Sequence, residues 1–213
     1  MEVHRLFSIP ILQFKLSTHD NYIFNYPKNT LIENQPLNWL SSVNTSFPDA
    51  QPDDFITGEQ LKNLKKDIYN EILLRFSNLN LNYKFKLSNF WYNIYGNGQG
   101  QELHNHLGYL QNEDPIWSGV YYHKNCENTS TVFQRTGMDY RTSIFRGCEN
   151  SEIGDTFLEH WSPCTSDGDI ILFPPYLQHY VKCSLKGNDL RVTFAFNLED
   201  SGTGGTQPPE TLS

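Results

Sequence analysis

Residues 168–183 read GDIILFPPYLQHYVKC and residues 190–198 read LRVTFAFNL, and these two stretches decide the fold. Each is a short run of β-branched and aromatic residues bounded by Gly, Pro, Asn or Asp, which is typical of strands joined by tight turns. Three upstream stretches have the same character: 87–96 (LSNFWYNIYG), 101–108 (QELHNHLG) and 118–124 (SGVYYHK). Many short strands after one helix indicate a mainly β fold: a sandwich, a barrel or a jelly roll.

One amphipathic helix is expected before these strands. Thr57 is followed three residues later by Gln60, which is the signature of a capping box at a helix N-terminus. Apolar residues then recur at helical spacing, with charged residues opposite them. The apolar positions are Leu61, Leu64, Ile68, Ile72 and Phe76. Such a helix supports a sheet, and we assign no chemistry to it.

The length of the chain fits one domain. We expect this domain to span residues 1–200, with an N-terminal strand, loops and the supporting helix in 1–83 and the β core in 84–200. Residues 201–213 carry too little apolar surface to offset the entropy of ordering them, so we expect a disordered tail there.

Charge and cysteine content narrow the class of protein. The net charge of -8 argues against a nucleic acid bound mainly through its phosphates. No apolar run reaches the roughly 18 residues that a membrane-spanning helix needs, and the N-terminus lacks the pattern of a signal peptide. The four cysteines show no CxxC spacing, which argues against a structural zinc site. We therefore expect a cytoplasmic protein with free thiols and no membrane partner.

Three histidines stand where strands could bring them together. On a strand, alternate side chains share a face, so His104 and His106 are expected to point the same way, and Glu102 with them. His179 follows a turn made rigid by Pro174 and Pro175, at the start of another strand. Imidazoles placed in this way are able to bind one metal ion, although histidines on a solvated strand edge would give the same pattern.

The strand at 190–198 has two different faces. Val192, Phe194 and Phe196 make one face apolar, whereas the other face carries small or polar residues and one arginine, Arg191. An arginine that points into a barrel must find an anion, because a buried unpaired charge is costly. The guanidinium matches a carboxylate through two parallel hydrogen bonds. The anion is either a ligand or an internal Asp or Glu.

Taken in order, these residues resemble a known pattern. His104-Asn105-His106, then His179, then Arg191 are similar to the HxD…H…R pattern of the iron(II)/2-oxoglutarate-dependent oxygenases. The run at 95–100, YGNGQG, resembles the glycine-rich approach to HxD in prolyl hydroxylases, and 119–122, GVYY, resembles the strand that follows it. Residues 93–95, NIY, match the NxY that precedes HxD in AlkB-like dealkylases. The resemblance covers roughly residues 90–198.

The resemblance implies a fold, a reaction and a set of site residues. The fold is a double-stranded β-helix, that is, a cupin-like jelly roll. The reaction is hydroxylation of a substrate by dioxygen, with iron(II) as cofactor and 2-oxoglutarate as cosubstrate, releasing succinate and CO2. Iron is expected on His104, His106 and His179. The residues expected to bind 2-oxoglutarate are Arg191, Thr193, Tyr122, Asn93 and Tyr95.

One position departs from the family pattern. His106 stands where the family has Asp, which leaves the metal one negative charge short, and a rival ligand set keeps a carboxylate by using Glu102 with His104 and His179. Three neutral imidazoles suit zinc as well as iron. The alternative function is therefore a cupin-like metal-binding module or isomerase without redox chemistry. The sequence leaves open the primary substrate, the native metal, the oligomeric state and the role of residues 124–160.

Overall fold

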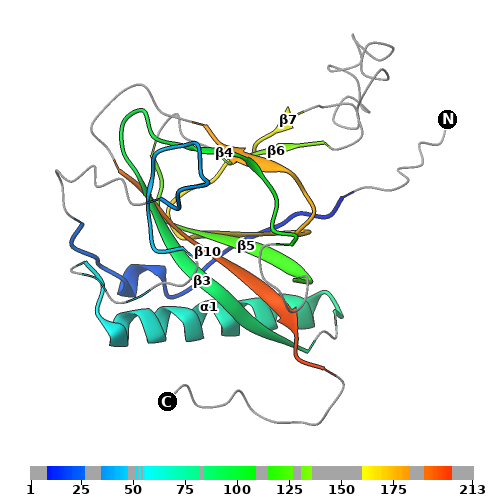
Figure 1. Cartoon of the computed structure of the whole chain (residues 1–213). Coiled ribbons are helices and arrows are strands. Elements are labelled where there is room, and N and C mark those ends of the chain that lie inside the picture. The colour runs from blue at the N-terminus through cyan, green and yellow to red at the C-terminus, as the bar shows by residue number, and fades with distance from the viewer. Residues whose placement is uncertain are drawn as a thin grey trace, which may run out of the picture.

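The chain folds into three layers in the computed structural model (Figure 1). The structure describes residues 9–26, 35–47, 51, 53, 55–81, 84–108, 115–126, 131–135, 160–182 and 190–202. Helix α1 (Gly58–Asn78) covers one face of a large sheet, and a smaller sheet lies on the other side of it. Most of the 124–160 segment and the tail from residue 203 lie outside the described residues.

Within the described residues, the strands form two antiparallel sheets. The strands are β1 (Leu12–Lys15), β2 (Asn44–Thr45), β3 (Phe85–Tyr95), β4 (Gln101–His104), β5 (Trp117–Lys124), β6 (Thr131–Gln134), β7 (His160–Trp161), β8 (Asp169–Phe173), β9 (His179–Val181) and β10 (Arg191–Asp200), with a 3-10 helix η1 at His19–Asn21. The six-stranded sheet has the order β1-β8-β5-β10-β3-β2, and the four-stranded sheet has the order β4-β9-β6-β7. This arrangement confirms the predicted jelly roll with one supporting helix.

Helix α1 begins at the expected capping box. The backbone N–H of Gln60 donates to Thr57 Oγ1 (3.2 Å), and Gln60 Oε1 accepts from the backbone N–H of Thr57 (3.0 Å). All five apolar positions that were expected to face the sheet are buried. They pack against residues of β3 and β10 in one hydrophobic cluster. Each such side chain contributes about 1.5–3 kcal/mol by leaving water, so this layer supplies much of the stability of the fold.

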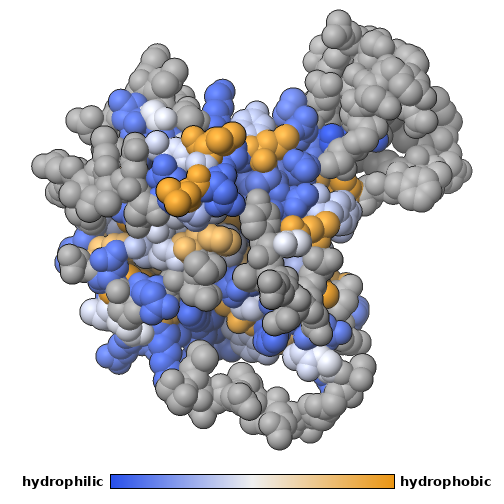
Figure 2. Space-filling model, viewed as in Figure 1, coloured by the Kyte–Doolittle hydropathy of each residue, from blue (hydrophilic) through white to orange (hydrophobic). Residues whose placement is uncertain are grey.

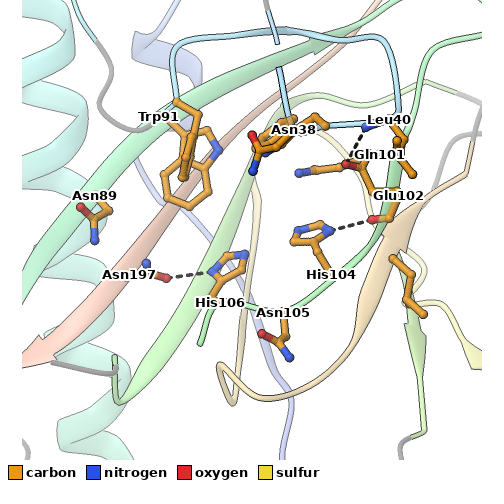
Figure 3. Close-up of a pocket in the computed structure, with 13 residues that line it drawn as sticks. Asn38, Leu40, Asn89, Trp91, Gln101, Glu102, His104, Asn105, His106 and Asn197 are labelled. Carbon is orange, nitrogen blue, oxygen red and sulfur yellow. Dashed lines mark hydrogen bonds between the residues drawn. The ribbon is translucent and has the colours of Figure 1, made fainter. Parts of the chain in front are cut away.

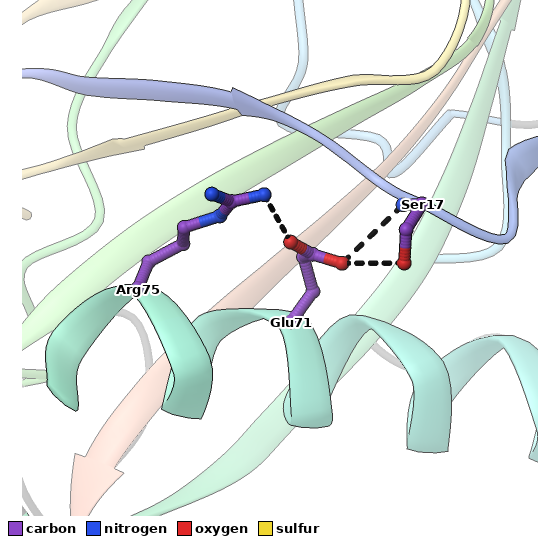
Figure 4. Close-up of polar contacts among 3 residues, drawn as sticks. All are labelled: Ser17, Glu71 and Arg75. Carbon is purple, nitrogen blue, oxygen red and sulfur yellow. Dashed lines mark hydrogen bonds and ion pairs between the residues drawn. The ribbon is translucent and has the colours of Figure 1, made fainter. Parts of the chain in front are cut away.

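A buried carboxylate joins the helix to the segment after β1. Glu71 is 5 % exposed and accepts hydrogen bonds from the backbone N–H (3.3 Å) and hydroxyl (2.8 Å) of Ser17. Its other oxygen pairs with Arg75, one helical turn away (Figure 4). Burial raises the pKa of the Glu71 carboxyl, but the hydrogen bonds and the arginine outweigh burial and hold the pKa below its ordinary value.

Strand β10 lies in the middle of the large sheet and separates two cores. Its apolar side chains, among them Val192, Phe194 and Phe196, pack toward α1 as the alternation predicts. Ala195, on the opposite face, belongs to a second cluster with Trp91 and other residues that face the small sheet. The site-forming face of β10 therefore lies inside the jelly roll, between the two sheets.

The surface is mainly hydrophilic on the face seen in Figure 2, where hydrophobic residues lie in small separate groups. This is expected when the large aromatic side chains are buried between layers. No helix in the described ranges is long and apolar enough to cross a bilayer.

Candidate functional site

The three histidines of the predicted ligand set come together. His104 ends β4 and His179 begins β9, and these two residues are directly paired across the antiparallel ladder. His106 lies two residues beyond β4. The ring of His104 lies 4.2 Å from that of His179 and 5.6 Å from that of His106, centre to centre. One ligand atom from each ring lies within 4.8 Å of the others.

Each ring is held by a hydrogen bond at Nδ1. His104 Nδ1 donates to the carbonyl oxygen of Glu102 (2.8 Å), and His179 Nδ1 donates to the carbonyl oxygen of Leu177 (2.9 Å). His106 Nδ1 donates to Asn197 Oδ1 (2.8 Å), as the dashed line in Figure 3 shows. Because each acceptor is an oxygen without a hydrogen, the proton must sit on Nδ1, and the lone pair of each ring is then on Nε2. This is the tautomer that ligation of a metal through Nε2 requires.

The electrostatics of the site favour neutral imidazoles. Burial lowers the pKa of all three histidines, to about 3 for His106 and well below the ordinary value for His179. A neutral imidazole is the form that ligates, and iron, zinc, copper and nickel all accept such nitrogens. Two nitrogens bound at a right angle to one metal at about 2.1 Å lie about 3 Å apart. The upper limit of 4.8 Å between the ligand atoms is therefore compatible with a common metal after a shift of the rings.

Glu102 is not part of this cluster. Its carboxylate accepts hydrogen bonds from the backbone N–H of Leu40 (3.0 Å) and of Ser41 (3.1 Å), which ties β4 to the segment before β2. Burial raises the pKa of the Glu102 carboxyl, but the hydrogen bonds outweigh burial and hold the pKa below its ordinary value. The backbone N–H groups therefore already bind the carboxylate as an anion. The geometry thus favours His106 over Glu102 as the third ligand.

Arg191 lies at the start of β10 and is 1 % exposed. One terminal nitrogen donates to Thr131 Oγ1 (2.8 Å), whereas Nε and the other terminal nitrogen are buried with no hydrogen-bond partner. The guanidinium carbon lies 5.4 Å from the ring centre of Tyr95 and 5.2 Å from that of Tyr122. No carboxylate of the described residues pairs with it. The arginine lies inside the barrel, as the strand pattern predicts, and the N–H groups of these two nitrogens are available to a hydrogen-bond acceptor.

The residues expected around the arginine are all buried, but they differ in what they contact. The Tyr122 hydroxyl donates to Thr131 Oγ1 (2.7 Å), so this oxygen accepts from both Tyr122 and Arg191 and keeps its own hydrogen to donate. Thr193 of β10 pairs with Tyr122 of the neighbouring strand β5. Asn93 has another partner: with its amide turned so that nitrogen faces Thr45 Oγ1 (2.7 Å), its oxygen accepts from the indole N–H of Trp91 (3.3 Å).

Three contributors to the site escaped the sequence reasoning. Thr131 begins β6, and no pattern in the sequence marks it. Trp91 was treated as strand filling, yet it lies against His106, 5.6 Å between ring centres. Asn197 was placed on the inner face of its strand, but its bond to His106 depends on two segments far apart in sequence. No local signal identifies such a contact.

A pocket opens beside His104 and His106. Its volume is about 210 Å³, and aromatic and amide side chains dominate its wall (Figure 3). The lining residues are Asn38, Trp39, Leu40, Phe47, Asn89, Trp91, Gln101, Glu102, Leu103, His104, Asn105, His106 and Asn197. The pocket thus reaches two of the three histidines, whereas neither His179 nor Arg191 lines it.

Several solved structures superpose on this chain at low sequence identity. HygX from Streptomyces hygroscopicus with nickel and 2-oxoglutarate bound superposes with a TM-score of 0.51 at 12% identity, covering 91% of this chain and 84% of HygX. HygX with nickel, 2-oxoglutarate and hygromycin B bound gives 0.51 at 13% identity, with the same coverage. An oxidoreductase of the 2OG-Fe(II) oxygenase family from Burkholderia pseudomallei gives 0.48 at 10% identity, covering 75% of this chain and 65% of that protein, less than two thirds of its length. At 12% and 13% identity, the likeness to the two HygX structures shows the fold alone.

Sequence comparison gives the family directly. None of the curated proteins compared with the chain matches it. The model of the family described as "Putative 2OG-Fe(II) oxygenase" matches residues 89–197, just over half of the chain, and this range holds all three histidines and the buried arginine. The chain therefore belongs to this family of 2-oxoglutarate- and iron(II)-dependent oxygenases.

Proposed function

We propose that the protein is an iron(II)- and 2-oxoglutarate-dependent dioxygenase that hydroxylates a substrate C–H bond and releases succinate and CO2. One observation carries the proposal: three histidines with fixed tautomers converge in the same interior as a buried arginine that has two unpartnered donors. Structural histidines would not need three separate Nδ1 anchors, and a structural arginine would have a carboxylate partner.

In this proposal His104, His106 and His179 hold the metal through Nε2. Their carbonyl acceptors keep the rings oriented, and burial keeps them neutral at physiological pH. When bound, iron(II) supplies the activation of dioxygen, of which one oxygen atom enters the substrate and the other enters succinate. The all-nitrogen ligand set leaves the negative charge at the metal to be supplied by the cosubstrate carboxylate.

Arg191 would bind the far carboxylate of 2-oxoglutarate. Its two unpartnered nitrogens lie on different edges of the guanidinium, so either one would donate to the carboxylate, and the Thr131 hydroxyl adds a further donor. Tyr95 and Tyr122 stack on the guanidinium and hold its plane. Thr193 stays a predicted cosubstrate contact. Because its amide is engaged by Trp91 and Thr45, Asn93 would act by supporting the pocket wall.

Apolar side chains would exclude water between the two halves of the site. Phe133 and Phe173 pack on His179, with ring centres at 5.8 and 4.8 Å, and Trp91 packs on His106. A dry surrounding strengthens the pairing between the guanidinium and a carboxylate, and it keeps reactive species away from solvent.

Anaerobic titration tests the proposal. The purified protein is titrated with iron(II) and then 2-oxoglutarate, bound iron is measured by elemental analysis, and the visible charge-transfer band expected of such a chelate is recorded. Air is then admitted and succinate is measured. We expect one iron per chain and a band that needs both additions. Stoichiometric iron without any 2-oxoglutarate binding would contradict the dioxygenase assignment.

The absence of a carboxylate from the described cluster supports one alternative. Three imidazoles form a good zinc site, so a cupin-like binding module or isomerase without redox chemistry is the second candidate. This alternative assigns no function to the buried Arg191. The two candidates separate in the same titration: zinc retained through purification, together with no succinate after iron loading in air, would favour the alternative.

Several broader expectations also stay proposals. We propose one domain over residues 1–200 with its catalytic core in 84–200, a cytoplasmic location, and 2-oxoglutarate as the small-molecule partner. The acidic net charge of -8 makes a nucleic-acid substrate held through its phosphates a poor fit.

A further inference from the structure

A β-bulge directs an asparagine into the pocket beside the histidines. Opposite β10, Trp91 pairs with Ala195 and Ser88 pairs with Asn197, so β3 has one residue more than β10 between these pairs. The backbone of Asn89, at this point, has φ of 45°. This left-handed conformation is uncommon for a residue with a side chain, and it is found where the surrounding structure imposes it, often at functional sites.

The bulge changes which residues of β3 face inward. Phe85 precedes it and Phe90 and Tyr92 follow it, and all three pack in the core under α1 although the regular alternation is broken between them. The additional residue, Asn89, lines the pocket together with Trp91 (Figure 3). A regular strand could not keep these aromatic side chains in the core on both sides of this point.

Two amides of the pocket have no partner in the part of the chain that the structure describes. These are the side chains of Asn89 and Asn38, which lie on different walls. By contrast, Asn105 accepts from the backbone N–H of Leu107 (3.1 Å), and Asn197 accepts from His106 and Ser118. The first two amides therefore keep both a donor and an acceptor for a ligand.

The remaining wall offers apolar surface but no ionic partner. No Lys or Arg of the described residues lines the pocket, and its one carboxylate, Glu102, is held by two backbone N–H groups. Trp39 and Trp91 supply aromatic faces, and Leu40 and Leu103 are 91% and 47% exposed at the rim. Away from the metal itself, a charged group entering this pocket would lose its hydration without gaining a side chain of opposite charge.

We propose that the pocket receives an uncharged part of the primary substrate that has an apolar face and carries hydroxyl or carboxamide groups. The Asn89 amide hydrogen-bonds this part of the substrate directly and orients it. The inference rests on the proposed dioxygenase function and adds the chemical class of the substrate. A pocket of about 210 Å³ holds one compact group, such as a single sugar ring or one amide side chain, rather than a whole drug-sized ligand.

The test is Asn89→Gly with Asn80→Gly as its control. Both positions have positive φ, 45° and 56°, so glycine is accommodated by the backbone in both cases and only the amide is lost. Asn80 follows α1 and does not line the pocket. Wild type and both variants are loaded with zinc(II) and 2-oxoglutarate to prevent turnover, and probes are titrated against tryptophan fluorescence, since two tryptophans line the pocket.

Two series of probes of similar size each contain one neutral, one cationic and one anionic member. One is D-glucose, D-glucosamine and D-glucuronate, and the other is N-acetylated, C-amidated glutamine, lysine and glutamate. We expect the neutral member of one series to bind at least tenfold more tightly than its charged analogues, and the series that binds identifies the source of the group. Asn89→Gly should weaken that binding at least fivefold, with Asn80→Gly within twofold of wild type.

The inference is overturned if a charged probe binds best, if neither neutral probe binds, or if Asn89→Gly binds the neutral probe as wild type does. Zinc content and 2-oxoglutarate affinity are measured on the same samples. If the wild-type protein binds neither zinc nor 2-oxoglutarate, the proposed function is refuted. If it binds both, any of the three results above refutes only the proposed substrate class.

Discussion

Replacing the buried arginine should separate its structural cost from its role in binding. In Arg191→Met, a neutral unbranched side chain takes the place of a guanidinium that is 1 % exposed and has two unpartnered nitrogens. We expect the ligand-free variant to be as stable as wild type or more stable, and its affinity for 2-oxoglutarate to fall steeply. A residue kept for stability would give the opposite result.

The interactions of Arg191 set the size of the stability change. The substitution loses one charged hydrogen bond to Thr131, about 1.5–3 kcal/mol, and two stacking contacts with Tyr95 and Tyr122, about 1 kcal/mol each. It removes two buried donors without partners, which cost about 1–3 kcal/mol each, and the desolvation of an unpaired charge as well. These quantified terms sum to between about −3 and +2.5 kcal/mol, and relief of the desolvation penalty of the charge adds to the gain, so the free energy of unfolding should stay the same or rise.

The loss of binding should be much larger than this. Truncating one partner of a buried, hydrogen-bonded charge pair costs about 2–5 kcal/mol, which corresponds to a roughly 30- to 4,000-fold weaker affinity. Iron affinity should change little, because none of the three histidine rings is hydrogen-bonded to Arg191.

Urea unfolding of the metal-free protein and anaerobic 2-oxoglutarate titration of the iron-loaded protein measure the two effects. Lys86→Met is the control, because Lys86 pairs with Glu199 at the surface (3.0 Å) and lies outside the pocket. It should leave the affinity for 2-oxoglutarate unchanged. If Arg191→Met unfolds at clearly lower urea and binds 2-oxoglutarate within threefold of wild type, Arg191 is structural and the cosubstrate assignment is wrong.

Four further substitutions test other parts of the molecule. His179→Ala should lose stoichiometric iron by elemental analysis while its circular dichroism spectrum stays native, and retained iron would remove it from the ligand set. Asn197→Leu, which frees the His106 ring, should weaken iron binding about 10- to 100-fold, and unchanged affinity would show that the ring needs no anchor. The pKa of Glu71 is held low by its hydrogen bonds despite burial, so its carboxylate stabilises the fold above about pH 4 and loses this effect as pH falls through the lowered pKa. Glu71→Gln should cost about 1–2 kcal/mol in urea unfolding at pH 7 and progressively less as the pH falls below about 4. Gly119→Ala would place a methyl group 2.3 Å from Cζ of Phe196, so thermal unfolding should show a loss of about 1–3 kcal/mol, and an unchanged midpoint would mean that the ring moves freely.

The sequence predicts those parts of the fold that depend on local periodicity. The capping box at Thr57 and the helical spacing after it locate α1. The alternation in β10 predicts that Val192 and its apolar neighbours face a core and that Arg191 faces the interior. These features follow from side-chain direction along one element, so no knowledge of the rest of the chain is needed.

The site is predictable only where a motif marks it. The order and spacing of the three histidines mark them in the sequence. Thr131 contacts Arg191 and Asn197 contacts His106, and these partners are 60 and 91 residues apart in the sequence, so no local pattern marks either contact. Asn89 could have been noticed: the apolar alternation of Phe85 and Leu87 resumes at Phe90, which implies one extra residue between them. Its place in the pocket wall depends on the other strand and is not readable from β3 alone.

The register of β10 explains how weakly patterned polar residues keep precise positions. Arg191 and Asn197 lie on the same face of this strand, and Val192, Phe194 and Phe196 lie on the other. A slip of one residue would turn the three apolar side chains into the polar site and the arginine toward α1. Removing those side chains from the core costs about 1.5–3 kcal/mol each, so the slip is opposed by roughly 5–9 kcal/mol. The apolar face therefore fixes the register of β10, and with it the positions of both the guanidinium and the anchor of His106.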